Sequence, residues 1–352
     1  MSKDPLVITD YQVCTCAGFD AAQTGASIAC GIPGFTLSPW FYCIPRDPEI
    51  DEEDQLVTGM VPFLDQFYTE HDRLLDMSIP LIKKVFSSSQ MKRKDLERTG
   101  IFFSVPGLEG MEEEPVTEKW FKETMANRLS IPEEIIAVDT DGSPVMMMHL
   151  IRVAEEYLRS GQIDIAIVGG VDSWLLGERL PEMDRKRRLK SNRNPDGFIP
   201  GEASSVLVLQ TESKAASRNS KPLAYITGIG IAEEPFDRAD RSSSGRGLRD
   251  AIIEAQGGTP YQCKYVIGNH NGDNYRGKEW GTLISLMPER LSMIEEFIHP
   301  ADCTGDTGAA AAGVMISYAL HSFSRGFACD DKCLIWCSSD SKLRSAICIK
   351  KG

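Results

Sequence analysis

Short runs of apolar residues recur along the chain without the alternation of apolar and polar positions that is typical of a half-exposed strand. The clearest runs lie at residues 101–105, 163–168 and 333–337. Each is too short for a stable helix, and each is rich in Ile, Val, Phe, Leu or Cys. This pattern predicts strands that are buried on both faces of a sheet.

Two longer segments show helical periodicity and begin with residues that favour a helix start. Ser143 and Pro144 precede the first segment, which extends to about residue 160, and they suit the N-cap and the first helical position. The string Thr307-Gly308 precedes the second segment, at about residues 309–323. A buried strand is predicted after each helix.

The order of these elements repeats. Residues 5–9 (Pro-Leu-Val-Ile-Thr) and 222–227 (Pro-Leu-Ala-Tyr-Ile-Thr) begin two segments that each continue through strand, helix and strand. Such a repeat predicts an α/β fold of duplicated βαβ halves with mainly parallel sheets. We expect the halves to span residues 1–215 and 216–352.

The composition limits the classes of partner. The chain has 352 residues and a formal net charge of −13, which disfavours nucleic acid as a partner. No apolar run reaches bilayer length and no signal peptide is recognisable, so we expect a cytoplasmic protein that does not bind membranes. The ten cysteines are scattered, and we expect buried free thiols, with no metal and no cofactor.

One basic cluster stands out within the loop at residues 184–194. It consists of Arg185, Lys186, Arg187, Arg188 and Lys190. The cluster is either a solvated loop or a contact surface for an acidic partner, such as a carrier protein or a phosphopantetheine phosphate.

Four strings in the same order resemble those of the β-ketoacyl synthase family. They are residues 159–171, with Arg-Ser-Gly and then Asp-Ile-Ala-Ile-Val-Gly-Gly-Val; 196–209, with Gly-Phe-Ile-Pro-Gly-Glu-Ala; the loop after Tyr265-Val266; and 304–313, with Thr-Gly-Asp-Thr-Gly. The resemblance covers most of the chain. It implies the thiolase-like fold, with duplicated halves in a layered αβαβα arrangement.

The resemblance also implies that the nucleophile is missing. The family places a cysteine at the N-terminus of the central helix, where this chain has Pro144 in an ungapped count and Gly142 in another alignment. The nearest cysteines in the sequence are Cys43 and Cys263. A proline removes both the thiol and the backbone N–H that contributes to the family's oxyanion hole.

The other catalytic positions are altered as well. His270 corresponds to the first of the family's two histidines, Asp306 to the second, and Ala301 to a lysine. A carboxylate at 306 would oppose a developing oxyanion. His270 is either a structural histidine or a base, and Ser143 is either a helix cap or a fallback nucleophile beside that base. Residues 338–341 (Ser-Ser-Asp-Ser) replace a Phe- and Gly-rich loop.

Three functional hypotheses follow. The first is a catalytically degenerate synthase-like protein that acts as an adaptor or partner subunit, as a homodimer or in a heterodimer with another thiolase-fold chain. The second is an acyltransferase or an atypical 3-oxoacyl synthase that uses Ser143 and His270, and the third is a sensor of acyl thioesters. The chain also resembles synthase-like proteins associated with bacterial secretion-cargo genes, which makes a cargo protein a partner to consider beside an acyl-carrier protein.

Overall fold

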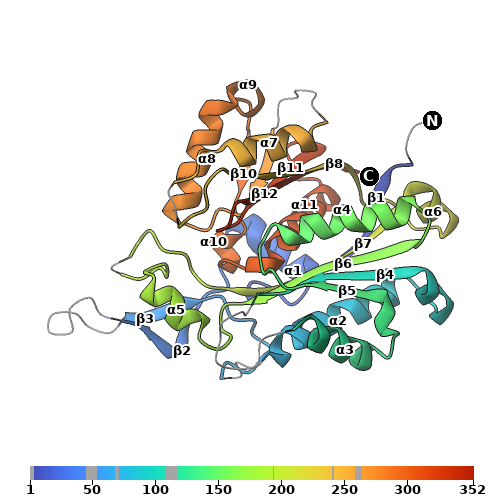
Figure 1. Cartoon of the computed structure of the whole chain (residues 1–352), viewed down its shortest axis with the longest axis horizontal. Coiled ribbons are helices and arrows are strands. Elements are labelled where there is room, and N and C mark those ends of the chain that lie inside the picture. The colour runs from blue at the N-terminus through green and yellow to red at the C-terminus, as the bar shows by residue number, and fades with distance from the viewer. Residues whose placement is uncertain are drawn as a thin grey trace.

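Ten strands pair in the order β10-β9-β11-β12-β8-β1-β7-β6-β4-β5, and a separate hairpin joins β2 to β3. The computed structural model describes residues 4–44, 54–67, 71–107, 117–192, 194–239, 242–257 and 264–352. Strands β1 and β8 share only three residue pairs at their first residues, so the ten strands divide there into two five-stranded parts. Figure 1 shows these parts as two sheets that separate around a central layer of helices.

The first part contains the N-terminal strands and the helices that connect them. The elements up to β7 are β1 (Leu6–Thr15), α1 (Ala21–Cys30), β2 (Thr36–Cys43), β3 (Asp54–Thr58), α2 (Asp72–Ser88), the 3₁₀ turn η1 (Arg93–Arg98), β4 (Thr99–Ser104), α3 (Glu118–Leu129), the 3₁₀ turn η2 (Glu133–Ile135), β5 (Ile136–Asp139), α4 (Met146–Arg159), β6 (Ile165–Ser173), α5 (Arg179–Arg185) and β7 (Glu202–Thr211).

The second part repeats this order of strands. After α6 (Glu212–Ser217), its elements are β8 (Ala224–Glu233), α7 (Arg246–Ala255), β9 (Tyr265–Gly268), α8 (Asn274–Leu286), α9 (Pro288–Leu291), β10 (Glu296–Ile298), α10 (Ala301–Thr304), the 3₁₀ turn η3 (Gly308–Ala310), α11 (Ala311–Arg325), β11 (Lys332–Ser338) and β12 (Leu343–Lys351).

The duplication predicted from the sequence is present in the strand pairing. In the first part, β4 pairs in parallel with β5 and β6, whereas β7 is antiparallel to β6 and β1. In the second part, β9 pairs in parallel with β10 and β11, whereas β12 is antiparallel to β11 and β8. The prediction of mainly parallel sheets was therefore wrong. In each half, no crossover helix of the βαβ kind connects the last strand to the strand before it in the sequence, so the last strand is antiparallel to its neighbours.

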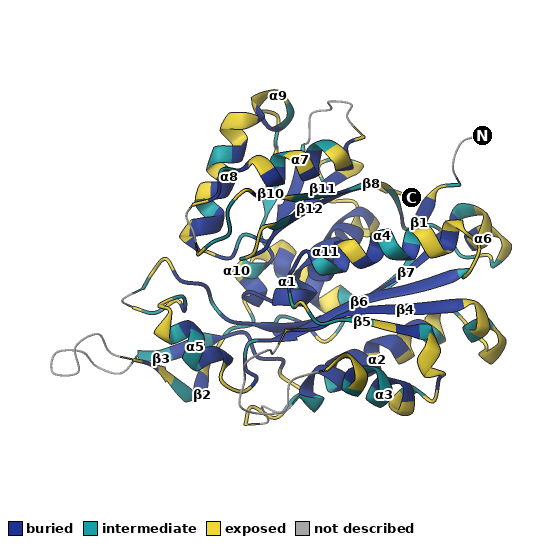
Figure 2. Ribbon diagram, in the orientation of Figure 1, coloured by how far each residue is buried: buried dark blue, intermediate teal, exposed yellow. Residues whose placement is uncertain are grey.

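Five layers follow from the packing of the helices on these sheets. One apolar cluster joins α2 and α3 to the outer face of the first sheet, and another joins α7 and α8 to the outer face of the second. A third cluster includes residues of α4, α11 and both sheets, so these two helices fill the middle layer. Figure 2 shows α11 buried within this middle layer, α4 buried on one face and exposed on the other, and exposed residues on the outer helices. The layered αβαβα arrangement is confirmed.

The starts of the two central helices meet. Cα atoms of α4 and η3 approach within 8 Å. The boundary at residues 215 and 216 stays a prediction, and it falls within α6, the helix that connects β7 to β8.

None of the helices among the described residues combines the length and apolar character needed to cross a bilayer. The nine described cysteines are free thiols, and only Cys30 and Cys329 among them are exposed. Cys263 lies outside the described residues.

A fully buried ion pair joins α2 to the first sheet. Two nitrogens of Arg73 donate to the carboxylate of Glu202 at 2.6 Å, and both side chains have zero exposure. The same carboxylate accepts the backbone N–H of Val61 and the hydroxyl of Ser173. Glu202 therefore connects the first residue of β7 to α2, to Val61 and to Ser173, with one arginine as its counter-charge.

We expect Arg73→Met to lower the free energy of unfolding by about 3–5 kcal/mol, because it leaves the Glu202 carboxylate buried without a counter-charge. Urea denaturation at pH 7 measures the loss. The matched control is Lys119→Met, which breaks an exposed ion pair with Glu123 and should cost less than about 1 kcal/mol. Equal losses in the two variants would contradict this account.

Candidate functional site

The position assigned to the nucleophile is a tight, buried turn before α4. Pro144 is buried, and the Ser143 hydroxyl accepts the backbone N–H of Val145 at 3.3 Å. The N–H of Ser143 donates to Asp141 at 3.1 Å. Regular helix begins only at Met146, two residues later than predicted, because Pro144 and Val145 form the turn that leads into it. The N-cap position of α4 is therefore occupied by Val145 and not by Ser143, whose hydroxyl bonds to the backbone of the preceding turn.

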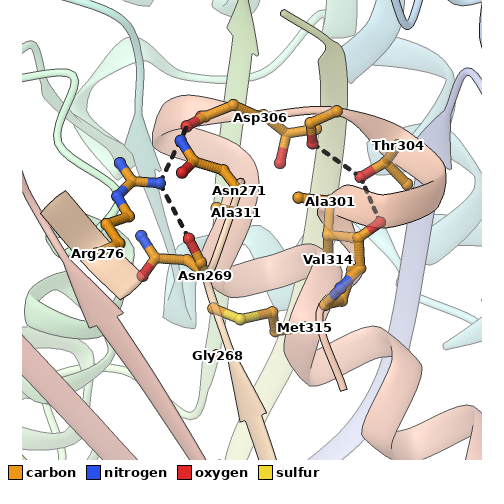
Figure 3. Close-up of a pocket in the computed structure, with 13 residues that line it drawn as sticks. Gly268, Asn269, Asn271, Arg276, Ala301, Thr304, Asp306, Ala311, Val314 and Met315 are labelled. Atoms are coloured by element: carbon orange, nitrogen blue, oxygen red, sulfur yellow. Dashed lines mark hydrogen bonds and ion pairs between the residues drawn. The ribbon is translucent and has the colours of Figure 1, made fainter. Parts of the chain in front are cut away.

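A small cavity lies beside the start of α11. Its volume of about 20 Å³ holds roughly one water molecule. Polar residues from the loop after β9 and from α8 form one side, including Asn269, Asn271 and Arg276, and Ala301 with Val314 and Met315 forms another (Figure 3).

Asp306 is the charged centre of this cavity. Arg276 pairs with its carboxylate at 3.0 Å, and the exposed fractions of the two side chains are 6% and 5%. The Asn271 amide and the backbone N–H of Gly308 also donate to the carboxylate. Burial acts to raise the pKa of Asp306, but Arg276, Gly308 and Asn271 outweigh it and lower the pKa below its usual value. Asp306 is therefore an ionised, paired carboxylate.

Arg276 is the residue that the sequence analysis did not single out. Its guanidinium donates to the carbonyl oxygen of Asn269 at 2.9 Å as well as to Asp306, as Figure 3 shows. Burial acts to lower the pKa of Arg276, but the surrounding carboxylates raise it above its usual value. An acid inside an apolar, Gly- and Ala-rich string was the available signal, since a buried carboxylate needs a cationic partner.

His270 is turned away from this cluster. Both of its neighbours, Asn269 and Asn271, line the cavity, whereas His270 is not among the lining residues described. Its ring lies 5.3 Å from the ring of His299, measured between centroids. Burial, followed by His299 and Arg276, lowers the pKa of His270, which favours the neutral ring. Within the described part of the chain, no hydrogen bond joins His270 to Ser143 or Asp306.

The loop at residues 338–341 is held by ion pairs. Asp340 pairs with Arg188 and lies 3.7 Å from Arg238, and both arginines also approach Asp273, at 3.5 and 2.6 Å respectively. Burial acts to raise the pKa of Asp340, and the arginines around it lower it below its usual value. The loop is thereby tied to the segment at residues 184–194 and to the start of α8.

This arrangement divides the predicted basic cluster. Arg185, Lys186, Arg187 and Lys190 are exposed, and Lys186 pairs with Glu182 one helical turn earlier. Arg188 instead has an exposed side-chain fraction of only 12%, and its guanidinium lies over the ring of Phe198. Because its charge is used inside the protein, Arg188 is left out of the contact surface that we propose below.

Asp172 is a further buried acid that was not singled out in the sequence, and it contacts η3 at the start of the central helix α11. Asp172, at the end of β6, accepts the backbone N–H of Ala309 at 2.8 Å and pairs with Arg179. Gly308 packs so closely on this carboxylate that a Cβ atom there would lie 1.8 Å from it. Among the described residues, no group of three or more His, Cys, Asp or Glu side chains is arranged to hold a metal ion.

Comparisons with known proteins point to one family. The family model "Beta-ketoacyl synthase, N-terminal domain" matches residues 109–215. The mitochondrial 3-oxoacyl-[acyl-carrier-protein] synthase of Arabidopsis thaliana is 28% identical over 200 residues, which cover 51% of this chain and 43% of that protein. The match thus spans less than half of this relative.

Solved structures share the fold over the whole chain. One contains a type II polyketide synthase acyl-carrier protein in complex with its ketosynthase, with a TM-score of 0.76, 15% identity and full coverage of both chains. Another is the ishigamide ketosynthase/chain length factor, with a TM-score of 0.73, 13% identity and full coverage of both chains. At such identities the likeness establishes the thiolase-like fold.

The depressed pKa of His270 predicts a dependence of stability on pH. Below about pH 6.5, the usual histidine pKa, the unfolded chain binds a proton that the folded protein resists. The stabilisation is therefore complete above this pH and is lost as the pH falls below it. We expect the free energy of unfolding, measured in urea between pH 7 and 5, to fall less steeply for His270→Gln than for the wild type.

The control for this comparison is His149→Gln, which removes a histidine from the exposed face of α4. It should leave the slope of stability against pH unchanged. A His270→Gln variant with the wild-type slope would show that His270 is not the buried group responsible.

Proposed function

We propose that this chain, which belongs to the β-ketoacyl synthase family, is a non-condensing subunit that uses the thiolase-like scaffold to bind a protein partner. The observation that carries the proposal is the pair of buried substitutes at the assigned catalytic positions. The resemblance assigns Pro144 to the nucleophile position and Asp306 to that of the second histidine; Pro144 is buried, and Asp306 is paired with Arg276.

The chemistry of condensation argues for this reading. Pro144 has neither a thiol nor a backbone N–H, so it supplies neither the nucleophile nor an oxyanion donor. Asp306 is ionised and would repel negative charge on a thioester oxygen. Loss of one oxyanion donor alone typically costs about 3 kcal/mol of transition-state stabilisation.

The space at the site supports the same conclusion. A cavity of about 20 Å³ is far below the roughly 300 Å³ at which small-molecule sites begin. The ion pairs of Asp340 with Arg188 and Arg238 hold the adjoining loop across this region. A cavity with so little room is poorly suited to bind an acyl thioester at this site, which weighs against the sensor hypothesis.

The acyltransferase hypothesis requires Ser143 to act as a nucleophile with His270 as its base. Ser143 is engaged with Val145, and the ring of His270 packs against His299. A serine nucleophile needs its base within hydrogen-bond reach. These contacts favour the binding role over acyl transfer.

We expect no condensation of malonyl and acyl thioesters and no covalent acyl-enzyme. Intact-mass spectrometry after incubation with acyl-CoA and with acyl-carrier protein tests this directly. A stoichiometric acyl adduct that disappears in Ser143→Ala would overturn the proposal in favour of acyl transfer.

Cys30→Ser and Cys329→Ser serve as controls, because these are the exposed thiols among the described residues. An adduct that survives Ser143→Ala but disappears in one of these variants reports a surface thiol and leaves the proposed role intact.

The proposed partner is a second thiolase-fold chain, either another copy or a related subunit. The solved ketosynthase/chain length factor and carrier-protein complexes motivate this assignment. Strand β5 is the last strand on its side of the sheet, and among the described residues no further strand pairs with it. The exposed Arg185, Lys186, Arg187 and Lys190 form the proposed contact for an acidic partner, with a carrier protein ahead of a secretion-cargo protein.

We expect a dimer that buries at least about 1,000 Å² and forms across β5. Light scattering at micromolar concentration should give twice the monomer mass. Ala137→Lys, at an exposed position of β5, should weaken the dimer because charge on an edge strand opposes pairing. The control is Ala216→Lys, at an exposed position of α6.

A wild-type protein that is monomeric alone would exclude the homodimer. The proposal would then require a monomer that forms a complex with a co-expressed thiolase-fold subunit, and this complex should also be weakened by Ala137→Lys.

A further inference from the structure

A second basic cluster forms at the end of the molecule opposite to residues 184–194. In Figure 1, α6 lies at the right-hand end and α5 at the left. Two segments contribute to it. Residues 83–98 carry six Lys or Arg against two acids, and residues 214–221 carry three Lys or Arg with no acid. This concentration of positive charge is unusual in a chain with a net charge of −13.

An open cleft of about 690 Å³ lies between these segments. It is bounded by the end of α2, the start of η1 and the connection from α6 to β8. Charged residues of its lining are Lys92, Lys94, Arg218, Lys221, Asp10 and Asp95. The volume falls in the range of about 300–1,000 Å³ that small-molecule sites occupy.

A specific ion pair lies in the lining of the cleft. Arg218 donates to both oxygens of Asp95, at 2.9 and 3.3 Å, and this pair fixes α6 against η1. The hydrogen bond from Arg218, partly opposed by burial, lowers the pKa of Asp95 below its usual value. Its charge is therefore compensated mainly by Arg218, with a smaller contribution from Lys94.

The other acid in the lining is also engaged. Asp10 accepts hydrogen bonds from the hydroxyls of Ser88 and Ser89 and from the backbone N–H of Tyr11. These three donors come from the end of α2 and from β1 itself. These hydrogen bonds stabilise the Asp10 carboxylate, and none of them comes from a lysine.

The four cations and two carboxylates of the lining leave a formal net charge of +2 at the cleft. Lys92, Lys94 and Lys221 are exposed and form no ion pair with any described residue. The C-terminal ends of α2 and α6 each contribute about half a negative charge, which together offset about half of this positive charge. Asn219 and Ser220 add an amide and a hydroxyl to the lining.

We infer that this cleft binds a small polyanion of the polyphosphate or phosphate-ester class, with the lysines as counter-charges and the amide and hydroxyl groups as donors. The cleft shares no lining residue with the cavity at Asp306. The inference is therefore independent of the proposed partner function, and either can fail without the other.

The test is calorimetric titration of the full chain with sodium tripolyphosphate at low salt. The variant K92Q/K94Q/K221Q removes the three free charges, and we expect it to bind at least about tenfold more weakly, since each exposed pair contributes up to about a factor of five. The matched control R185Q/K186Q/K190Q changes the net charge by the same amount at the opposite end of the molecule. It should bind within about twofold of the wild type.

Equal losses in the two variants would mean general electrostatic attraction and would overturn the inference. Absence of tripolyphosphate binding to the wild type would also overturn it. A hexaglutamate peptide is titrated in parallel. If it binds through the same lysines while tripolyphosphate does not, the cleft is a docking surface for an acidic protein and the small-molecule assignment is wrong.

Discussion

The rest of the fold depends on the burial of one helix, α11. In α11, every residue from Ala311 to Phe323 is buried, so the helix needs apolar cover on all sides and not along a single stripe. A single sheet covers only one side. Two sheets and a second central helix are needed, and the duplicated halves supply them. Close contact at its start depends on Gly313, where a Cβ atom would lie 1.8 Å from the hydroxyl of Ser205.

A centre that is this densely packed admits charge only in neutralised form, because an unpaired ion in such surroundings costs several kcal/mol. Four buried acids in the strands, in α8 and in the loop before η3 are accordingly each paired with an arginine. The pairs are Arg73 with Glu202, Arg179 with Asp172, Arg276 with Asp306 and Arg344 with Glu279. These pairs connect helices, strands and loops around the centre.

The sequence predicted the elements that depend on local signals. Apolar runs without alternation gave the buried strands, and small residues with a cap gave the two central helix starts. It failed where geometry is set by distant segments. The direction of a strand depends on the path of the connection that leads to it. Arg188 points inward because Asp340 and Asp273, which are distant in the sequence, lie beside it in the folded protein.

The same reason explains the cluster of charge that the sequence analysis overlooked. Lysines near residue 92 and near residue 221 are ordinary within their own segments, and only the Arg218–Asp95 contact brings them to one cleft. Asp306 was noticed as an acid at an unusual position. Its pairing with Arg276 was not predicted, because Arg276 lies in α8 and comes close to Asp306 only in the folded protein.

The Asp306–Arg276 pair also limits which residues either of the two positions can accept. A neutral residue at 306 would leave the buried guanidinium without its counter-charge, and a change of Arg276 alone would leave the carboxylate unpaired. Every single step from the present state thus passes through a less stable protein. The two residues are entrenched by each other, so descendants of this chain are expected to keep both or to exchange both together.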